Sequence, residues 1–309
     1  MKNLDQYILE SLKGYKPGAI DTKKHKEQLP QSCENYFANQ KVDVDDIENL
    51  DTSNVTNMKS MFENTTFSSN SLDLSGWDVS KVTNMAYMFS YIDDLKSLDL
   101  SSWDVSNVTD MSFAFGNCKN LEYIDVSNWR TTNLRKIHQL FMFCDKLKTI
   151  DGISDLDVSK ITRLDGIFRY CSSLESLDLS TWDVSNLIHM KNIFEECRRL
   201  EYIDLSGWDV SNVIDDNIYI FCNCYSLTNI IFGPGWGKSN ADNIKFILYD
   251  CGEDKGYKLS DETYESMLTM YDRKKAGLSP MEITFNRRHN IPDGFKKQME
   301  ARGYIIELK

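Results

Sequence analysis

The chain has 309 residues, a formal net charge of −12, 41% hydrophobic and 12% aromatic residues. This hydrophobic content argues against a disordered chain. The acidic balance disfavours nucleic-acid binding, because a surface that binds phosphates needs a basic face. No apolar run reaches the ~18–20 residues that cross a bilayer, and Asp5 and Glu10 interrupt any secretory signal at the N-terminus. We therefore expect a cytoplasmic or virion-associated protein without a signal peptide or transmembrane segment.

The first 30 residues predict a short amphipathic helix followed by a linker. Leu4, Ile8 and Leu12 lie on one helical face, and a basic stretch, Lys23 to Lys26, lies within the linker. Two roles stay open for this helix: it docks on the region that follows, or another protein recognises it as an address peptide. Residues 31–50 include Val42-Asp43-Val44-Asp45, which imitates the repeat described next, and they predict an atypical cap.

A tandem repeat dominates residues 31–239. Its tryptophans recur at spacings of 26 residues or multiples close to it, with Leu156 in the one skipped slot. A fixed period in this range is typical of a solenoid, in which each coil buries its apolar side against the coils before and after it. The tryptophans of this structural column are Trp77, Trp103, Trp129, Trp182 and Trp208.

Each repeat opens with a short alternating segment, such as Leu98-Asp99-Leu100-Ser101. Alternation with period two predicts a half-buried strand whose leucines point inward and whose aspartates point outward. Parallel stacking of these strands would place the aspartates in a ladder. Local hydrogen bonds, a partner-binding acidic stripe and bridging calcium ions are three open roles for it. The ladder is Asp73, Asp99, Asp125, Asp151, Asp178 and Asp204.

The second part of each repeat carries apolar residues at i, i+3, i+4 and i+7, which predicts one face of a short helix. Its last two positions form a phenylalanine column and a cysteine column. Cysteine is often buried as a small hydrophobe, so we expect packed thiols, although coils ~4.8 Å apart would also allow disulfides. No zinc site is expected, since Cys222 and Cys224 lack a second pair. The columns are Phe62, Phe89, Phe115, Phe141, Phe168 and Phe194, and Cys118, Cys144, Cys171, Cys197 and Cys224.

Two further features of the repeat carry structural predictions. A second aspartate follows five of the six tryptophan slots (Asp78, Asp104, Asp157, Asp183, Asp209), and with the serine two residues later it predicts a turn that binds local backbone amides. The fourth repeat departs from the pattern at Arg130, Gly152 and Leu156. We expect a local kink or bulge there, with a contact site as the alternative.

The period stops after Trp236, and residues 240–309 predict a small α+β C-terminal cap or domain. Strands are expected at 244–248, 281–285 and 304–308, and helices at 260–276 and 292–302, each followed by a glycine. Basic pairs at 274–275, 287–288 and 296–297 make this the basic end of an acidic protein. They are either a solvated face or a contact for an acidic partner.

The run L-D-L-S-x-W-D-V-S-N-V-T-N-M-x-x-M-F-x-x-C-x-x-L, over about residues 51–236, resembles the BspA-like leucine-rich repeats of mycoplasma surface lipoproteins and related bacterial, protist and viral proteins. The resemblance implies an α/β repeat fold: a right-handed leucine-rich-repeat solenoid with parallel strands on one face and short helices on the other. It also implies adhesion or protein–protein interaction. Relatives on cell surfaces carry an export signal, which this sequence lacks.

No motif predicts catalysis. There is no glycine-rich phosphate loop, G-x-S-x-G or H-E-x-x-H, and equivalent aspartates offer no acid–base pair in unlike environments. We expect no catalytic residue, metal or cofactor. The favoured function is a scaffold that binds a protein partner through its strand face. A component of a viral or phage particle docked through its termini, or an enzyme with a C-terminal active domain, are the alternatives. The candidate contacts are Asp99, Tyr123, Asp125, Asp178, Tyr202 and Asp204.

Overall fold

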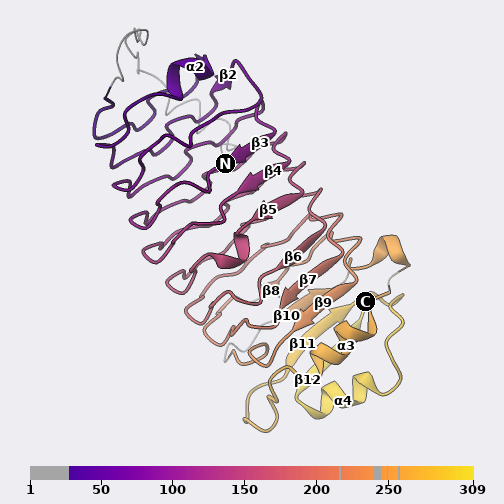
Figure 1. Cartoon of the computed structure of the whole chain (residues 1–309). Helices are drawn as coiled ribbons and strands as arrows, with labels where there is room; N and C mark the ends of the chain where they lie inside the picture. The colour runs from indigo at the N-terminus through magenta and orange to yellow at the C-terminus, as the bar shows by residue number, and fades with distance from the viewer. Residues whose placement is uncertain (1–27, 216, 240–244, 249, 257) are drawn as a thin grey trace, which may run out of the picture.

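The computed structural model describes residues 28–215, 217–239, 245–248, 250–256 and 258–309. The helix expected near residues 4–12 lies outside these ranges. The described chain is an elongated stack of coils that ends in a small α/β region (Figure 1). Adjacent coils pair in parallel, with Ser97 opposite Tyr123 and Tyr202 opposite Asn229. The predicted repeat solenoid is thus confirmed, in the form of a β-solenoid with parallel strands and coils of about 26 residues.

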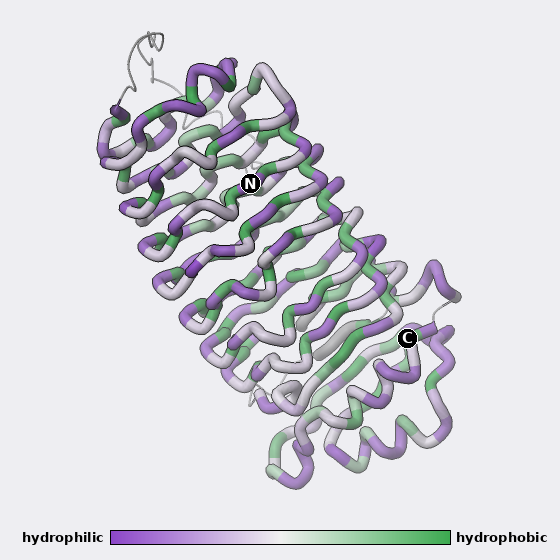
Figure 2. Tube along the Cα trace, viewed as in Figure 1, coloured by the Kyte–Doolittle hydropathy of each residue, from purple (hydrophilic) through white to green (hydrophobic). Residues whose placement is uncertain are grey.

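Short strands line one side of the stack. Their middle residues are buried and their flanking residues face outward, as the alternating pattern predicted. Figure 2 shows the resulting interchange of hydrophobic and hydrophilic segments along each coil. Three parallel sheets form this side: β1 (Lys41–Val42) with β2 (Thr66–Phe67); β3 (Ser97–Asp99), β4 (Tyr123–Asp125) and β5 (Thr149–Asp151); and β6 (Ser176–Asp178), β7 (Tyr202–Leu205) and β9 (Asn229–Phe232).

The short helices expected on the opposite side are absent from the described coils, and that prediction was wrong. Residues 58–65 form successive turns instead, with Met61 N–H donating to Met58 O and Thr65 N–H to Phe62 O. The alternate N–H groups leave the coil: those of Met58 and Phe62 donate to carbonyls of the next coil, at 2.9 Å each. An α-helix about 10 Å across could not keep such bonds between coils this close.

Left-handed residues make these turns possible. Two positions four residues apart adopt positive φ in successive coils, which is the conformation that the third residue of a type II turn requires. Gly166 occupies one of them, with φ of 62°. The non-glycine residues are Asn35, Asn39, Ser60, Asn64, Tyr87, Tyr91, Phe113, Asn117, Gln139, Phe143, Tyr170, Asn192, Glu196 and Asn223.

The interior is built from columns of identical side chains. Neighbouring phenylalanine rings stack with centroids 5.3–6.0 Å apart along one continuous column. Every buried indole donates its Nε1–H to a backbone carbonyl of the preceding coil, for example Trp208 to Leu179 O at 3.0 Å. Each column cysteine is buried, and Cys144 Sγ–H donates to Phe115 O at 3.0 Å. The phenylalanine column is Phe37, Phe62, Phe89, Phe115, Phe141, Phe168, Phe194 and Phe221.

The expected irregularity of the fourth repeat is a break in the sheet. The strand sheet ends at β5 and begins again at β6. Between them lies a 3₁₀ turn, η1 (Ile153–Asp155), which follows Gly152 at φ of 80°. A Cβ on Gly152 would lie 2.2 Å from Ser127 Cα, so only glycine fits. Leu156 is buried in the tryptophan slot, and Trp182 Nε1–H donates to Ile153 O.

The N-terminal coils differ from the repeat strand that Val42 to Asp45 imitates. Strand β1 ends at Val42, and a single helical turn, α2 (Val44–Ile47), follows. Asp43 caps this turn by accepting the N–H of Asp45, which redirects the chain away from the strand. Ile47 is buried, and its carbonyl accepts the indole N–H of Trp77. The segment thereby takes the place of a preceding coil for the first tryptophan.

The C-terminal region contains a parallel sheet in the order β12, β11, β10, β8 and two helices on a chain that no longer repeats. The helix expected at 260–276 was predicted too long: after Met267 the chain turns, and buried Arg273 donates to the carbonyls of Gly237, Ser239 and Ser279. The expected strands 281–285 and 304–308 are confirmed. The elements are β8 (Asn217–Ile218), β10 (Lys245–Leu248), η2 (Glu253–Lys255), α3 (Asp261–Met267), β11 (Met281–Phe285), α4 (Phe295–Ala301) and β12 (Tyr304–Leu308).

Candidate functional site: the acidic strand face

The outward side chains of β3 to β9 form two parallel columns. One column carries hydroxyl, phenol and amide groups, and it includes Tyr123 and Tyr202. The other carries a carboxylate on each strand from β3 to β7. Register places Asp99 beside Asp125 and Asp125 beside Asp151. We call this surface the acidic strand face, and its residues are Asp99, Tyr123, Asp125, Asp151, Asp178, Tyr202 and Asp204.

Each of these carboxylates except that of Asp151 is held by the serine two residues later. Ser101 N–H and Ser101 Oγ–H both donate to Asp99 Oδ1, at 3.0 and 2.7 Å. Ser127 binds Asp125 in the same way, and Ser206 N–H donates to Asp204 Oδ1 at 2.8 Å. The hydroxyl and amide of Ser101 lower the pKa of Asp99. The local hydrogen bonding considered from the sequence is therefore present.

Tyr123 links two adjacent coils across this face. Its hydroxyl donates to Asp151 Oδ2 at 2.8 Å and lies 3.4 Å from Asp125 Oδ2. The bond to Asp151 raises the pKa of Tyr123 to about 12. Tyr202 lies in the equivalent column, and its pKa is raised by burial and by the charges of Asp204 and Asp178. The structure thus brings all six candidate contacts onto one face, together with Asp151, which the sequence had already placed in the aspartate ladder.

The second aspartate column has the structural role that was predicted for it. Ser80 N–H and Ser106 N–H donate to Asp78 Oδ1 and Asp104 Oδ1, both at 3.0 Å. The same contact joins Ser185 to Asp183. These aspartates lie beyond the corner that follows each strand. They bind local backbone as the strand-face aspartates do, but on a different part of the coil.

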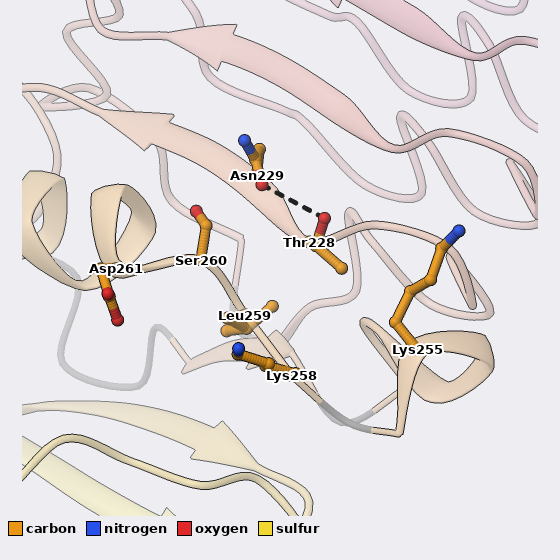
Figure 3. Close-up of a pocket in the computed structure, with 7 residues that line it drawn as sticks. All are labelled: Thr228, Asn229, Lys255, Lys258, Leu259, Ser260 and Asp261. Atoms are coloured by element: carbon orange, nitrogen blue, oxygen red, sulfur yellow. Dashed lines mark hydrogen bonds between the residues drawn. The ribbon is translucent and has the colours of Figure 1, made fainter.

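A hollow of about 370 Å³ lies at the C-terminal end of the strand face (Figure 3). The sequence did not predict it. Asn229, which follows Tyr202 in the outward column, forms part of its lining. Lys255 extends from the opposite wall and pairs with Glu201 at 3.1 Å. The hollow exists because α3 packs beside β9, a long-range contact that no local pattern signals. Its lining is Thr228, Asn229, Lys255, Lys258, Leu259, Ser260 and Asp261.

Three of the four histidines lie in the described ranges, and each has a hydrogen-bond partner; the ring of His289 lies 2.9 Å from Cys251 O and 3.1 Å from Asn286 O. His138 Nδ1 lies 3.2 Å from Ser112 Oγ, and burial lowers the pKa of its imidazole. His189 Nδ1 lies 2.9 Å from the buried Asp215 carboxylate. These are two separate pairs on different coils, and within the described ranges no carboxylate hydrogen-bonds to His138. Neither pair therefore forms a serine–histidine–carboxylate triad.

The described residues contain no group of three or more His, Cys, Asp or Glu side chains placed to hold a metal ion. No helix that the structure describes is both long enough and apolar enough to cross a bilayer.

The comparison with known proteins identifies a family but no activity. A family model described as a Mycoplasma protein of unknown function, DUF285, matches residues 31–151 and again residues 142–256. Together the two matches span residues 31–256, more than half of the chain. They overlap at the fourth repeat, where the strand sheet is interrupted. No curated protein matches the chain.

Proposed function

Because the chain belongs to the DUF285 family of mycoplasma proteins of unknown function, its role must be inferred from its surface, and we propose that it is a non-catalytic scaffold that binds a protein partner through the acidic strand face. The observation that carries this proposal is the column of carboxylates in register with two tyrosines. Tyrosines on a rigid surface are effective anchors for protein partners.

The rigidity of this face supports a role in binding. The aspartates keep one oxygen fixed by serine, and Tyr123 is fixed by Asp151. Side chains that are already ordered lose little conformational entropy when a partner docks. The strands themselves are held by the coils on either side, so the face is displayed without a change of shape.

The proposal extends to the repeat family, the handedness of the solenoid, the class of partner and the location of the protein. We propose that the chain is related to the BspA-like leucine-rich repeats and that its solenoid is right-handed, as parallel crossovers nearly always are. The turn-lined side would then replace the helices of other leucine-rich repeats. A column of carboxylates repels phosphate backbones, which favours a protein over a nucleic acid as the partner. We place the protein in the cytoplasm or on a virion.

The test uses charge removal that keeps the local fold. Asp99→Asn, Asp125→Asn and Asp204→Asn together remove three charges, while each asparagine Oδ1 still accepts the serine N–H. The matched control is Asp78→Asn, Asp104→Asn and Asp183→Asn, which removes the same charge from the second column. Peptides selected against the wild type from a displayed random library serve as probes.

Calorimetric titration of the selected peptides gives the outcome. We expect the strand-face variant to bind them about tenfold or more weakly, equal to about 1.4 kcal/mol, and the control to bind like the wild type. Equal affinities for all three proteins would show that the peptides bind elsewhere and would remove the basis of the proposal. Thermal melts of both variants establish that they remain folded.

A further inference from the structure

The C-terminal sheet has an open edge at β12. This strand pairs with β11 in parallel and is the last strand of its sheet. Lys309 N–H donates to Phe285 O and Arg287 N–H to Lys309 O, while Met281 N–H donates to Gly303 O. Bonding alternates along a strand, so residues 303, 305, 307 and 309 face β11. The backbone groups of Tyr304, Ile306 and Leu308 therefore point to the open edge, where no described residue bonds to them.

The last strand of the solenoid is treated differently. Helix α3 packs along β9 and closes its edge with side chains. Thr263 Oγ1 accepts the N–H of Ile230 at 2.9 Å, and Ser266 Oγ accepts the N–H of Phe232 at 3.1 Å. These hydroxyls take the place of a further strand. The chain thus prevents strand pairing at β9, whereas it leaves β12 unsealed.

Two devices that usually protect an edge strand, a proline and a bulge, are missing from β12. The strand contains no proline, and its five-residue ladder with β11 has no bulge. Ile305 and Leu308 are 47% and 48% exposed. The adjacent Lys309 ammonium is engaged by Glu282 at 3.1 Å and Glu307 at 2.7 Å, so it does not act as an unpaired repelling charge. An exposed, regular and apolar edge is a template for pairing with another chain.

We propose that β12 pairs antiparallel with β12 of a second copy of this chain, so that one sheet runs through both copies. When two copies are related by a two-fold axis, the same edge of each copy pairs with the other, and the outward backbone N–H and C=O groups of both strands form hydrogen bonds. A register centred on Ile306 sets Tyr304 opposite Leu308 of the partner subunit and Ile305 opposite Glu307 of the partner subunit. No like charges then lie directly opposite, which is the arrangement that cross-strand pairs favour.

The expected dimer is weak because its contact is small. Two five-residue strands and their flanks bury less than the roughly 1,200 Å² of a standard stable interface. A dissociation constant in the micromolar range is therefore expected. The strand face lies on other elements, so dimerisation through β12 leaves it open, and the fate of this inference is independent of the proposed function.

Proline substitutions at neighbouring positions give a matched test. Leu308→Pro removes an N–H that points to the open edge, and its side chain is largely exposed. Glu307→Pro removes an N–H that faces β11. We expect the Leu308 variant to keep the wild-type melting temperature and to be monomeric, and the Glu307 variant to melt at a lower temperature. Ile305→Lys, which places a charge at the edge without altering the backbone, should also give a monomer.

Sedimentation equilibrium of the full chain, from about 1 to 300 µM, measures the association. The wild type should shift from monomer to dimer across this range, and the Leu308 and Ile305 variants should stay monomeric throughout. A wild type that is monomeric at every concentration would overturn the inference. So would a dimer that persists unchanged in both edge variants, because the contact would then lie elsewhere.

Discussion

The turn-lined side of the solenoid can be tested with one methyl group, at Gly166. This residue has φ of 62°, and a Cβ built on it would lie 3.5 Å from its nearest neighbour, in the side chain of Gln139. Gly166→Ala therefore meets no steric obstacle, and its effect on stability reports the backbone conformation alone. The change in the free energy of unfolding has one sign if this segment forms turns and the opposite sign if it forms an α-helix.

The magnitude follows from the conformation. A left-handed L-residue is disfavoured by roughly 1–2 kcal/mol, while alanine stabilises by about 0.4–1 kcal/mol through the unfolded chain. Gly166→Ala should therefore lower the free energy of unfolding by about 1 kcal/mol. In an α-helix the same change would raise it by about 1 kcal/mol. Gly166→Asn should be milder, because asparagine tolerates this region and already occupies the equivalent position as Asn192.

Gly76 provides the matched control. It lies in the same repeat array, its φ is not in the left-handed region, and no atom lies within 4 Å of an added Cβ. Gly76→Ala should raise stability by about 0.4–1 kcal/mol. Urea unfolding followed by tryptophan fluorescence measures both variants. If both alanines stabilise equally, the segment around Gly166 is helical and the turn assignment is wrong.

Three further outcomes are expected. Trp208→Phe should lower the free energy of unfolding by about 2–4 kcal/mol in urea titrations, because it opens a cavity and removes one of the two hydrogen bonds that the buried Leu179 carbonyl accepts, the other coming from Trp182 N–H. A loss under about 1 kcal/mol would contradict the role of the indole bond. The pKa of Asp99 is lowered in the folded state, so the Asp99 carboxylate stabilises the fold at pH values above the unfolded pKa of about 3.9, and this stabilisation is lost as the pH falls through the folded pKa. The difference in melting temperature between wild type and Asp99→Asn should accordingly shrink between pH 7 and about pH 3. A constant difference would refute this. Burial raises the pKa of the Cys144 and Cys171 thiols, so a colourimetric thiol reagent at neutral pH should reach the cysteine column only after unfolding; fast native labelling, or missing thiols in denaturant, would show an exposed or oxidised column.

The sequence predicted the solenoid because each repeat carries the same buried and outward positions at a fixed period. Leu98 and Ile124 alternate with aspartates, and the period fixes which residues of neighbouring coils meet. The prediction for the opposite side was wrong because an α-helix and successive turns place apolar residues at the same spacing. In residues 58–65, turns that close between residues three apart bring Met58, Met61 and Phe62 to the same side, as a helix would. Only the N–H groups that cross to the next coil distinguish the two structures, and hydrophobic spacing does not record them.

The left-handed positions were a signal that sequence reasoning could have used. Asparagine and glycine occupy Asn35, Asn39, Asn64, Gly166 and Asn192, a frequency typical of turns rather than of helix interiors. The same positions hold Tyr87, Phe113 and Phe143 in other coils, however, where the aromatic rings pack between neighbouring turns. Packing between coils thus holds residues in a conformation that their own preferences oppose, and it conceals the turn pattern in any single repeat.

The candidate site shows the same division between local and long-range information. The two outward columns follow from period two and a fixed repeat, so Asp125 and Tyr202 could be placed on one face from the sequence. The contact from Tyr123 to Asp151 crosses to the next coil, and the hollow beside Asn229 depends on α3. Both need the stacking geometry itself. Because α3 seals β9 and ends the face, the length of the binding surface is set by the C-terminal region and not by the repeat. A partner that recognises this face should therefore be sensitive to substitutions of Thr263 and Ser266, whose hydroxyls hold the edge of its last strand.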